Sequence, residues 1–307
     1  EIRYTERAGH AEEIAAKAAA DGVYCVTAIG GDGTINEIAR SLIHTNTVLG
    51  IIPCGSGNGL ARHLRIPMDS RKAINIINKG NISAIDYGKI NNKPFFCTCG
   101  VGFDAFVSLK FSAAGRRGIL TYLEKTLLEC LNYKPETYEV ESEDSKTKHK
   151  AFLIACGNAS QYGNNAYIAP KASLQDGLMN VTVLEPFTVI DIPSLAFQLF
   201  NKTLDQNSRI RTFKSKKIHI HRTHPGLVHY DGDPVMMNEE IDVEIIAKGL
   251  LVITPEKADR EQNVLKKASD YFIGLKPKGE NLVEDITQRN KQIIDRNIEF
   301  FKRLTKK

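Results

Sequence analysis

The sequence predicts an α/β fold: a doubly wound domain over residues 1–85, a mainly β domain over 86–255 and a helical segment over 256–307. Two apolar runs of strand length, "VYCVTAIG" (23–30) and "TVLGIIPCG" (47–55), each lead through a glycine turn into a helical pattern, as in a buried parallel sheet. From residue 86 the chain becomes alternating, β-branched and punctuated by turns, which is typical of strands.

Helical patterns flank both apolar runs. "HAEEIAAKAAADG" (10–22) is rich in alanine and stops at a glycine, and "NGLARHLRI" (58–66) is a helix that Pro67 breaks. Between them, "TINEIARSLIH" (34–44) is amphipathic. Strand, turn and helix thus alternate twice, which predicts a doubly wound parallel sheet. The apolar face of the 34–44 helix carries Ile35, Ile38, Ala39 and Leu42.

The second domain should be built from hairpins. In "AIDYGKINNKPFFCTCGVGFDA" (84–105) a turn is expected at Asn91-Asn92, and helices are expected to interrupt the strands near 118–132 and 189–204. The apolar helix "GILTYLEKTLLECL" (118–131) is either core or one wall of a cleft for an acyl chain. Further strands are expected within 137–159, 177–187, 215–235 and 241–255.

The last segment carries a rough apolar stripe in "DITQRNKQIIDRNIEFFKRLTKK" (285–307), with basic residues on its other faces. Two interpretations are open: a terminal helix that packs back on the body, and a helix that lies on a membrane surface.

Composition excludes several classes of protein. The 41 basic and 36 acidic residues leave a net charge of +5, and no long basic tract indicates nucleic-acid binding. No run approaches the roughly 18 apolar residues of a spanning helix. The six cysteines are scattered without zinc spacing, which favours reduced core thiols in a cytoplasmic protein.

The stretch "AIGGDGTINEIAR" (28–40) places Asp32 among three glycines, just before a helix. Amides at a helix N-terminus bind anions, and glycines let the backbone approach a phosphate closely. A carboxylate facing phosphate requires a cation between them, so the turn favours Mg²⁺ and ATP. The alternative is a turn residue that caps the helix.

A second loop of the same kind, "PCGSGNGLAR" (53–62), follows the next strand. Loops that follow neighbouring parallel strands face one crevice at the carboxyl edge of the sheet. Together the two loops predict a nucleotide-binding site.

These two motifs, in this order, resemble the catalytic domain of the diacylglycerol kinase-like lipid kinases, which include diacylglycerol, sphingosine and ceramide kinases and bacterial soluble lipid kinases. The resemblance covers about residues 1–255 and continues through four further motifs. These are "IDYG" (85–88), "GVGFDA" (100–105), "LQDGLMNV" (174–181) and "HYDGDPV" (229–235).

The resemblance implies an enzyme that transfers a phosphoryl group from ATP, with Mg²⁺, to a lipid hydroxyl. The implied ATP-phosphate residues are Gly30, Gly31, Asp32, Gly33, Thr34, Ile35 and Asn36 in the first loop, with Gly55, Ser56 and Asn58 in the second. Thr5 matches a threonine at the nucleotide edge, or is simply a helix-entry residue.

The same resemblance makes Asp231 the catalytic base, with Asp233 as its neighbour. Two acids two residues apart can face one side, and one can raise the proton affinity of the other. The alternative is a plain Asp-Gly turn between two strands.

For metal binding, the resemblance implies Asp32 directly or through water, with Asp86 in the same network. Asp86 is otherwise a turn residue at the start of a hairpin. A second, structural metal loop would use Asp176 and the carbonyls of Ser173 and Leu178. Gln175 stands there where some relatives have another acid, and an Asp-Gly turn is the alternative.

Two departures from the family pattern bear on the substrate. The second loop reads Gly55-Ser56-Gly57-Asn58-Gly59, whereas many diacylglycerol kinases have an aspartate in it, so the loop is closer to sphingosine- and ceramide-kinase-like members. The family also opens with a strand and a loop that would precede Glu1, and we expect the natural protein to carry them.

The expected partners are a membrane lipid substrate and the membrane surface at which a cytoplasmic enzyme meets it. Nucleic acid is not expected, and a homodimer is left open. Two other functions remain as alternatives: an NAD kinase, whose family shares the G-G-D-G-T motif, and a lipid- or nucleotide-binding regulator that has lost catalysis.

Overall fold

The computed structural model describes residues 1–104 and 133–256, and the chain divides into two compact units, Glu1–Pro255 and Glu256–Lys307. The described helices and strands all belong to the first unit. The helices expected at 118–132 and beyond residue 256 lie outside the described residues. Among the described helices, none is long and apolar enough to cross a membrane.

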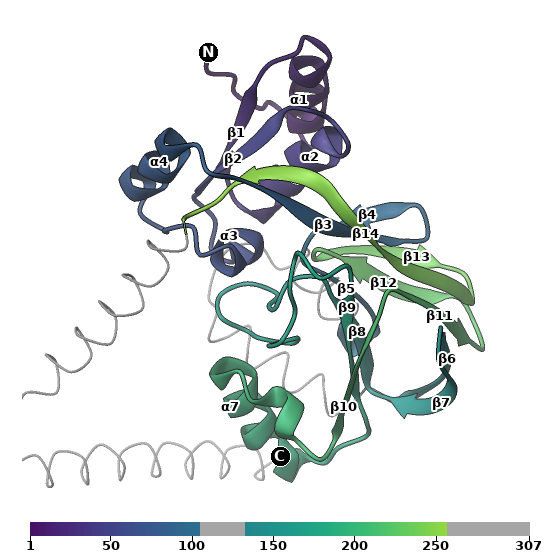
Figure 1. Cartoon of the computed structure of the whole chain (residues 1–307). Helices are drawn as coiled ribbons and strands as arrows, with labels where there is room; N and C mark the ends of the chain where they lie inside the picture. The colour runs from purple at the N-terminus through teal and green to yellow at the C-terminus, as the bar shows by residue number, and fades with distance from the viewer. Residues whose placement is uncertain (105–132, 257–307) are drawn as a thin grey trace, which may run out of the picture. The chain divides into compact units, whose positions relative to one another are not determined.

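The N-terminal part is a parallel α/β arrangement. Strands β1 (Cys25–Gly30) and β2 (Val48–Pro53) pair in parallel, with α2 (Asp32–Leu42) as the crossover between them. Three further helices pack around these strands (Figure 1). They are α1 (His10–Ala20), α3 (Gly59–His63) and α4 (Ser70–Lys79).

Both faces of strand β2 are buried because helices cover both. Leu49 and Ile51 point into the cluster that holds α2, whereas Val48 packs in a second cluster with Ile76 of α4. This continuous apolar strand is therefore buried along its whole length, as the run "TVLGIIPCG" predicts.

The C-terminal part is a β-sandwich. One face belongs to a six-stranded sheet in the order β10-β9-β8-β5-β12-β13. Its strands are β5 (Thr98–Gly102), β8 (Leu153–Gly157), β9 (Met179–Leu184), β10 (Ile210–Ser215), β12 (Gly226–Tyr230) and β13 (Asp233–Met237).

The other face belongs to an eight-stranded sheet in which β1 and β2 also take part, in the order β1-β2-β14-β11-β6-β7, with β3 on β14 and β4 on β3. The added strands are β3 (Ile82–Ile90), β4 (Lys93–Phe95), β6 (Glu136–Ser142), β7 (Lys146–Ala151), β11 (Lys217–Arg222) and β14 (Glu240–Ile253). Side chains of both sheets share one buried apolar core, among them Val140 and Ile220 from this sheet and Val101 and Val181 from the other.

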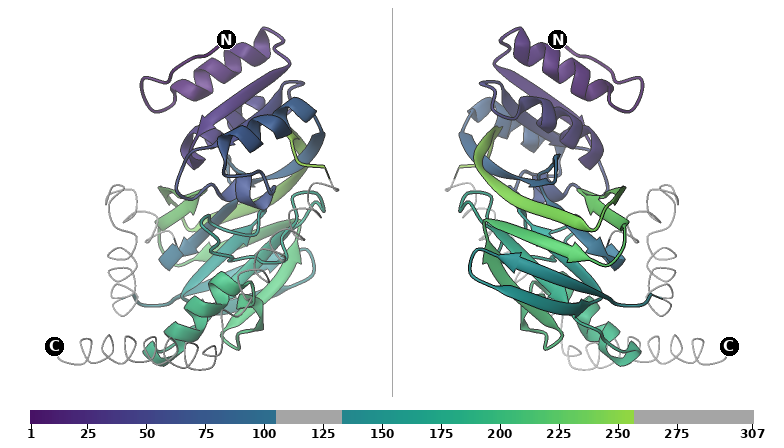
Figure 2. Two further views of the ribbon diagram at one scale, coloured as in Figure 1. Left: turned by 90° about the vertical axis from the view of Figure 1, so that its left-hand side faces the viewer. Right: turned by 90° about the vertical axis from the view of Figure 1, so that its right-hand side faces the viewer.

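Strand β14 joins the two parts. Its first half pairs with β11 in the sandwich, and Val252 near its end pairs in parallel with Leu49 of β2. The views in Figure 2 show this strand, coloured green to yellow, running from the sandwich to the helices of the N-terminal part. The expected boundary at residue 85 falls inside β3, which also pairs with β14 along its length.

The predicted fold class is confirmed: a doubly wound N-terminal part precedes a β-sandwich. The expected turn at Asn91 is present, with a positive φ of 49°. The helix expected near 189–204 is three short pieces, because Lys202 adopts a left-handed conformation that ends the middle one. These pieces are η1 (Val189–Asp191), α7 (Ile192–Asn201) and η2 (Leu204–Gln206).

Candidate active site

The two glycine loops lie against each other at the end of the parallel strands. The amide of Cys54 donates to the carbonyl of Gly30 over 2.7 Å, which continues the β1–β2 pairing to the loops. A Cβ placed on Gly55 would lie 2.6 Å from the Cα of Gly31, a distance that real Cβ atoms do not show. Gly31 and Gly55 are therefore needed because two backbones meet, a reason that the sequence alone did not reveal.

The carboxylate of Asp32 joins the first loop to the second. It accepts hydrogen bonds of 2.7 Å from the amides of Asn58 and Gly59, at the start of α3. Burial raises the pKa of Asp32, and these two amides oppose the rise. The capping alternative is thus realised, but the helix that Asp32 caps is α3 rather than its own.

An open, anion-compatible surface remains at the start of α2. The first-turn amides of a helix have no helical partners, and here the N-cap residue is Gly31, which has no side chain to cap them. A Cβ on Gly33 would meet no atom within 4 Å, so a ligand can reach this backbone closely. Ser56 is exposed at the tip of the second loop, where its hydroxyl is accessible.

Other residues of the predicted phosphate set serve the fold. Ile35 is fully buried in the core, and Asn36 is buried beside it. The side chain of Asn58 folds back on its own loop, where it donates to the carbonyl of Gly55 and accepts from its amide. Thr34 packs against Gly30, leaving no room for a Cβ there.

Thr5 lies in the exposed segment that precedes α1. The residues that follow it are held on α2, because the amides of Gly9 and Ala11 donate to the carboxylate of Glu37. The structure therefore fixes the start of α1 against the helix of the first loop, while Thr5 itself is left at the surface.

Asp231 sits in the tight turn between β12 and β13. Asp231 and Gly232 both have positive φ, 49° and 91°, as in a two-residue hairpin turn of type I′. Its carboxylate accepts three backbone hydrogen bonds of 2.7–3.0 Å, donated by Phe96, Cys97 and Thr98. The turn alternative is thus correct as geometry, and the carboxylate is held in place as well.

Burial raises the pKa of Asp231 to about 6, against the opposing effect of the three amides and of Arg40. Burial, rather than the neighbouring Asp233, is thus the largest cause of the rise. Asp233 is turned away onto Arg40, with 3.2 Å between Oδ2 and Nη2, and 61% of its side chain is exposed. The guanidinium of Arg40 also lies over the ring of Tyr230, 5.2 Å from its centroid.

Cys97 connects the Asp231 turn to the glycine loops. Its amide donates to Asp231, and its sulfur lies 3.4 Å from a Cβ placed on Gly59, whose own amide donates to Asp32. Burial, together with the two carboxylates, raises the pKa of the Cys97 thiol well above its ordinary value. Asp32 and Asp231 are therefore connected through the contact between Gly59 and the side chain of Cys97.

A loop that the sequence did not single out completes this region. The side-chain amide of Asn158 donates to the carbonyls of Asp86 and Phe96, and the amide of Asn164 donates to the carbonyl of Gly57. His63 of α3 contacts Ser160 over 2.9 Å. These residues escaped attention because single asparagines and serines in a loop carry no spacing signal.

A buried ion pair, also missed, lies behind the Asp231 turn. Nε2 of His229 and Oδ2 of Asp104 are 2.6 Å apart, and both side chains are buried. Burial lowers the pKa of His229, but the Asp104 carboxylate outweighs this effect and raises it. The pair joins two motifs, "GVGFDA" and "HYDGDPV", that are 125 residues apart.

The residues predicted to bind metal fall in two places: Asp86 lies against the loop of Ser173, Asp176 and Leu178, whereas Asp32 lies on the glycine loops. Asp86 is buried, and its two oxygens accept the amides of Gly177 and Lys248 at 2.8 Å. Asp176 accepts the amide of Leu178 and pairs with Lys214 over 2.8 Å, while the hydroxyl of Ser173 accepts the amide of Gln175. Within residues 1–104 and 133–256, no group of three or more acidic, histidine or cysteine side chains could hold a metal ion.

The cysteines behave largely as core thiols. The five within the described residues are free, and Cys97, Cys99 and Cys156 are buried. Cys54 is exposed and Cys25 is partly exposed, so the prediction of buried thiols does not extend to these two.

Paired glycine loops at the end of a parallel sheet, with a held carboxylate beside them, define a phosphotransferase of the kinase type. Comparison with known families agrees. Residues 1–90 match the family model described as "Diacylglycerol kinase catalytic domain", and residues 97–253 match "YegS C-terminal NAD kinase beta sandwich-like domain". The chain belongs to the diacylglycerol kinase-like lipid kinase family.

Individual relatives are distant but cover most of the chain. A protein of Salmonella arizonae named "Probable lipid kinase YegS" is 29% identical over 256 residues, 81% of this chain and 84% of its own. A protein of Citrobacter koseri named "Probable lipid kinase YegS-like" is 29% identical with the same coverage. A crystal structure described as a diacylglycerol kinase from Bacillus anthracis has the same fold, with a TM-score of 0.67 at 20% identity over 83% of this chain and 85% of that one.

The two glycines Gly33 and Gly55 should respond oppositely to a methyl group. Gly33→Ala meets open space and removes a helical glycine, so the free energy of unfolding should stay the same or rise by up to about 1 kcal/mol. Phosphate binding should weaken, because the new Cβ stands on the approach to the amides. Gly55→Ala collides with Gly31 and should lower the free energy of unfolding by about 1–3 kcal/mol. Denaturant unfolding and nucleotide titration of both variants measure this contrast; equal stability losses would contradict it.

Asp86 should stabilise the fold without any metal. Asp86→Ala leaves the amides of Gly177 and Lys248 without acceptors, and each such loss costs about 1–3 kcal/mol. We expect urea unfolding in EDTA to show this loss. Asp176→Ala is the matched control, because its partly exposed pair with Lys214 contributes at most about 1 kcal/mol. If the Asp86 variant is as stable as wild type in EDTA, the structural role is contradicted and metal binding becomes the better explanation for this residue.

Proposed function

We propose that this protein transfers the γ-phosphate of ATP to the hydroxyl of a membrane lipid. One observation carries the proposal: the glycine loops and Asp231 are connected through Gly59 and Cys97, whose sulfur lies 3.4 Å from a Cβ placed on Gly59. Phosphoryl transfer needs amides and cations for the phosphates, together with a carboxylate near the acceptor hydroxyl. These groups lie next to one another here.

The phosphates would bind at the first turn of α2, where Gly33 is open and exposed. The hydroxyl of Ser56 can donate to them from the second loop. Arg62 supplies a nearby cation: its Nε donates to the carbonyl of Gly57 over 2.8 Å, and its charge favours ionised Asp32. The family pattern had not indicated Arg62, because its position depends on a contact between the α3 helix and the loop that precedes it.

Mg²⁺ fits this site through Asp32 alone. Each Asp32 oxygen takes one amide, and a carboxylate oxygen accepts more than one contact, so Asp32 can face a cation held by nucleotide phosphates. When bound, Mg²⁺ would spread the charge of the phosphates during transfer. A second ion at Ser173, Asp176 and Leu178 would have to displace the ammonium of Lys214 from Asp176.

Asp231 would act as the base that takes the proton from the lipid hydroxyl. Three amides fix the orientation of its carboxylate, so the group needs no rearrangement before it acts. Its raised pKa of about 6 lies close to neutral pH, which favours general-base catalysis. Arg40 pairs with Asp233, which would leave Asp231 as the base, and its positive charge favours the ionised form of Asp231.

The acceptor is proposed as a lipid alcohol, diacylglycerol-like or sphingoid-base-like. Support comes from the match of residues 1–90 to the diacylglycerol kinase catalytic domain and from relatives named as lipid kinases. An enzyme of this kind would use cytoplasmic ATP and dock on a membrane surface from that side. The catalytic-domain match favours a lipid over NAD as acceptor.

The direct test is incubation with radiolabelled ATP, Mg²⁺ and separate samples of diacylglycerol, sphingosine, ceramide and NAD. Label in an organic-extractable product supports the proposal and identifies the lipid class, whereas label in NAD alone overturns it. Asp231→Asn should abolish at least about 99% of transfer, since a base contributes about 10²–10⁴-fold, while ATP binding persists. Undiminished transfer would remove Asp231 from the mechanism.

The pH dependence of turnover should reveal the same carboxyl group. Below a pH of about 6 Asp231 is protonated and cannot accept a proton, so kcat should fall about tenfold per pH unit there and level off above it. Asp233→Asn should leave this fall of kcat at acid pH (the acid limb) in place, because burial, not Asp233, is the main cause of the raised pKa of Asp231. A limb that vanishes in the Asp233 variant would contradict the assignment.

A further inference from the structure

Helix α7 is apolar on two opposite sides. On one side Leu195 and Leu199 pack into the buried cluster that contains Phe103 and Phe152. On the other side large apolar residues face solvent. The exposed fractions are 88% for Ile190, 68% for Phe197 and 46% for Phe200, and Pro193 is exposed between them.

These four residues form one stripe, here called the α7 stripe: Ile190, Pro193, Phe197 and Phe200. Their spacing of three, four and three residues places them along one side of a helix. A surface helix normally carries polar residues there, and a contiguous exposed apolar strip marks a site of interaction. Other exposed apolar residues, such as Ile74 on α4 and Met236 on β13, belong to different elements.

We propose that the α7 stripe is the membrane-docking surface of the protein and inserts into the acyl region of the bilayer that holds the lipid substrate. The inference rests on the proposed lipid kinase function and assigns it a surface. Apolar and aromatic side chains on a helix that lies along a bilayer penetrate the boundary between headgroups and acyl chains.

The area of the stripe argues against a second copy of this chain as the occupant. An aromatic side chain offers about 150–250 Å² at full exposure. At the observed exposed fractions the stripe presents on the order of 400 Å², about half of the ~800 Å² that each partner buries in a stable interface. A bilayer sets no such minimum, because its affinity rises with each apolar group inserted.

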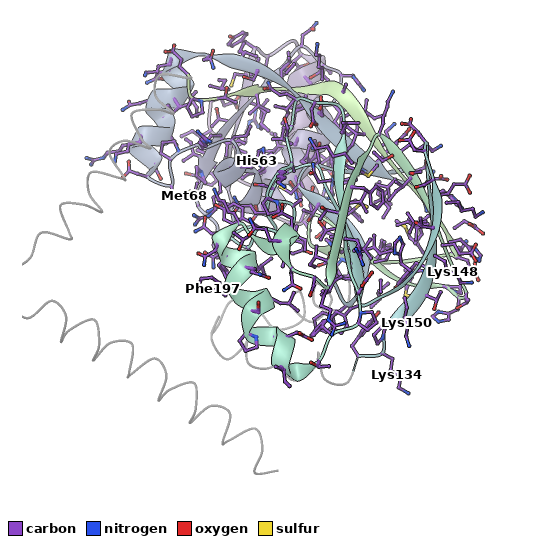
Figure 3. All side chains as sticks on the ribbon, turned by 60° about the horizontal axis from the view of Figure 1, so that its bottom comes forward. His63, Met68, Lys134, Lys148, Lys150 and Phe197 are labelled. Carbon is purple, nitrogen blue, oxygen red and sulfur yellow. The ribbon has the colours of Figure 1, made fainter. Side chains whose placement is uncertain are left out.

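Contacts also connect the stripe to the candidate active site. The carbonyl of Leu199 accepts the amide of Tyr167, and the loop leading to Tyr167 reaches Gly57 through Asn164. In Figure 3, Phe197 lies on the left-hand side of the molecule, as does Met68, which follows the second glycine loop. Lys202, just after the helix, holds its ammonium 4.4 Å from the centre of the Tyr167 ring and adds a cation near the lipid headgroups.

The test is co-flotation of the whole chain with vesicles of phosphatidylcholine and phosphatidylglycerol. The double variant F197S/F200S should bind these vesicles at least about tenfold more weakly than wild type, because two inserted rings are lost. Ile74→Ser is the matched control and should bind like wild type. Raised salt should weaken wild-type binding only modestly, since apolar insertion dominates.

A parallel assay separates this inference from the proposed function. The double variant should phosphorylate a short-chain, water-soluble form of the lipid class that the labelling assay identifies at the wild-type rate, whereas on vesicles that contain this lipid its rate should fall with its binding. If wild type phosphorylates neither form, the kinase proposal fails, and the flotation result still decides the docking surface.

Three results would overturn the docking surface. The first is equal vesicle binding by the double variant and wild type. The second is a double variant that melts at a lower temperature than wild type but binds vesicles equally well. This result would mean that another part of this chain covers the stripe. The third is a wild-type dimer in size-exclusion chromatography that the double variant converts to monomer, again with vesicle binding unchanged.

Discussion

The arrangement of the site depends on one partly buried contact, in which the amides of Asn58 and Gly59 donate hydrogen bonds to the carboxylate of Asp32. A carboxylate at the start of a helix accepts hydrogen bonds from amides that would otherwise be unpaired. Its negative charge also interacts favourably with the positive end of the helix dipole. Because Asp32 belongs to the first loop and the amides belong to the second, the bonds fix both loops relative to each other. With the start of α3 occupied, the start of α2 is left for a ligand.

The same physical device appears at the other predicted acidic residues. Asp231 gathers three amides from residues 96–98, and Asp86 gathers one amide from each of two distant segments. In each case a carboxylate closes an irregular stretch of backbone that no sheet or helix can satisfy. Asp231 is buried among the three amides that it accepts, and this burial raises its pKa. The carboxylate that is held by the most hydrogen bonds is therefore also the one suited to exchange a proton near neutral pH.

Much of the fold was predictable, because it rests on local signals. The apolar runs, the glycine turns and the alternation after residue 86 specify strands and helices directly. The pattern also singled out Asp32, Ser56 and Asp231 as candidate site residues, which stay predictions. It could not show that Asp86 meets Lys248, since 162 residues separate them and only the pairing of β3 with β14 unites them. Arg40 and Asn158 were missed for the same reason, and Ile35 was assigned to the phosphates although its helical face turns it into the core.

The central claim is that Asp32 ties the two glycine loops together before any nucleotide binds. Amide hydrogen exchange at Asn58 and Gly59, measured by NMR on the nucleotide-free protein and on Asp32→Asn, tests it most directly. The account predicts that both amides are protected in wild type and that at least one exchanges about tenfold or more faster in the variant, because an amide side chain offers only one acceptor oxygen. Fast exchange of both amides in wild type would contradict it.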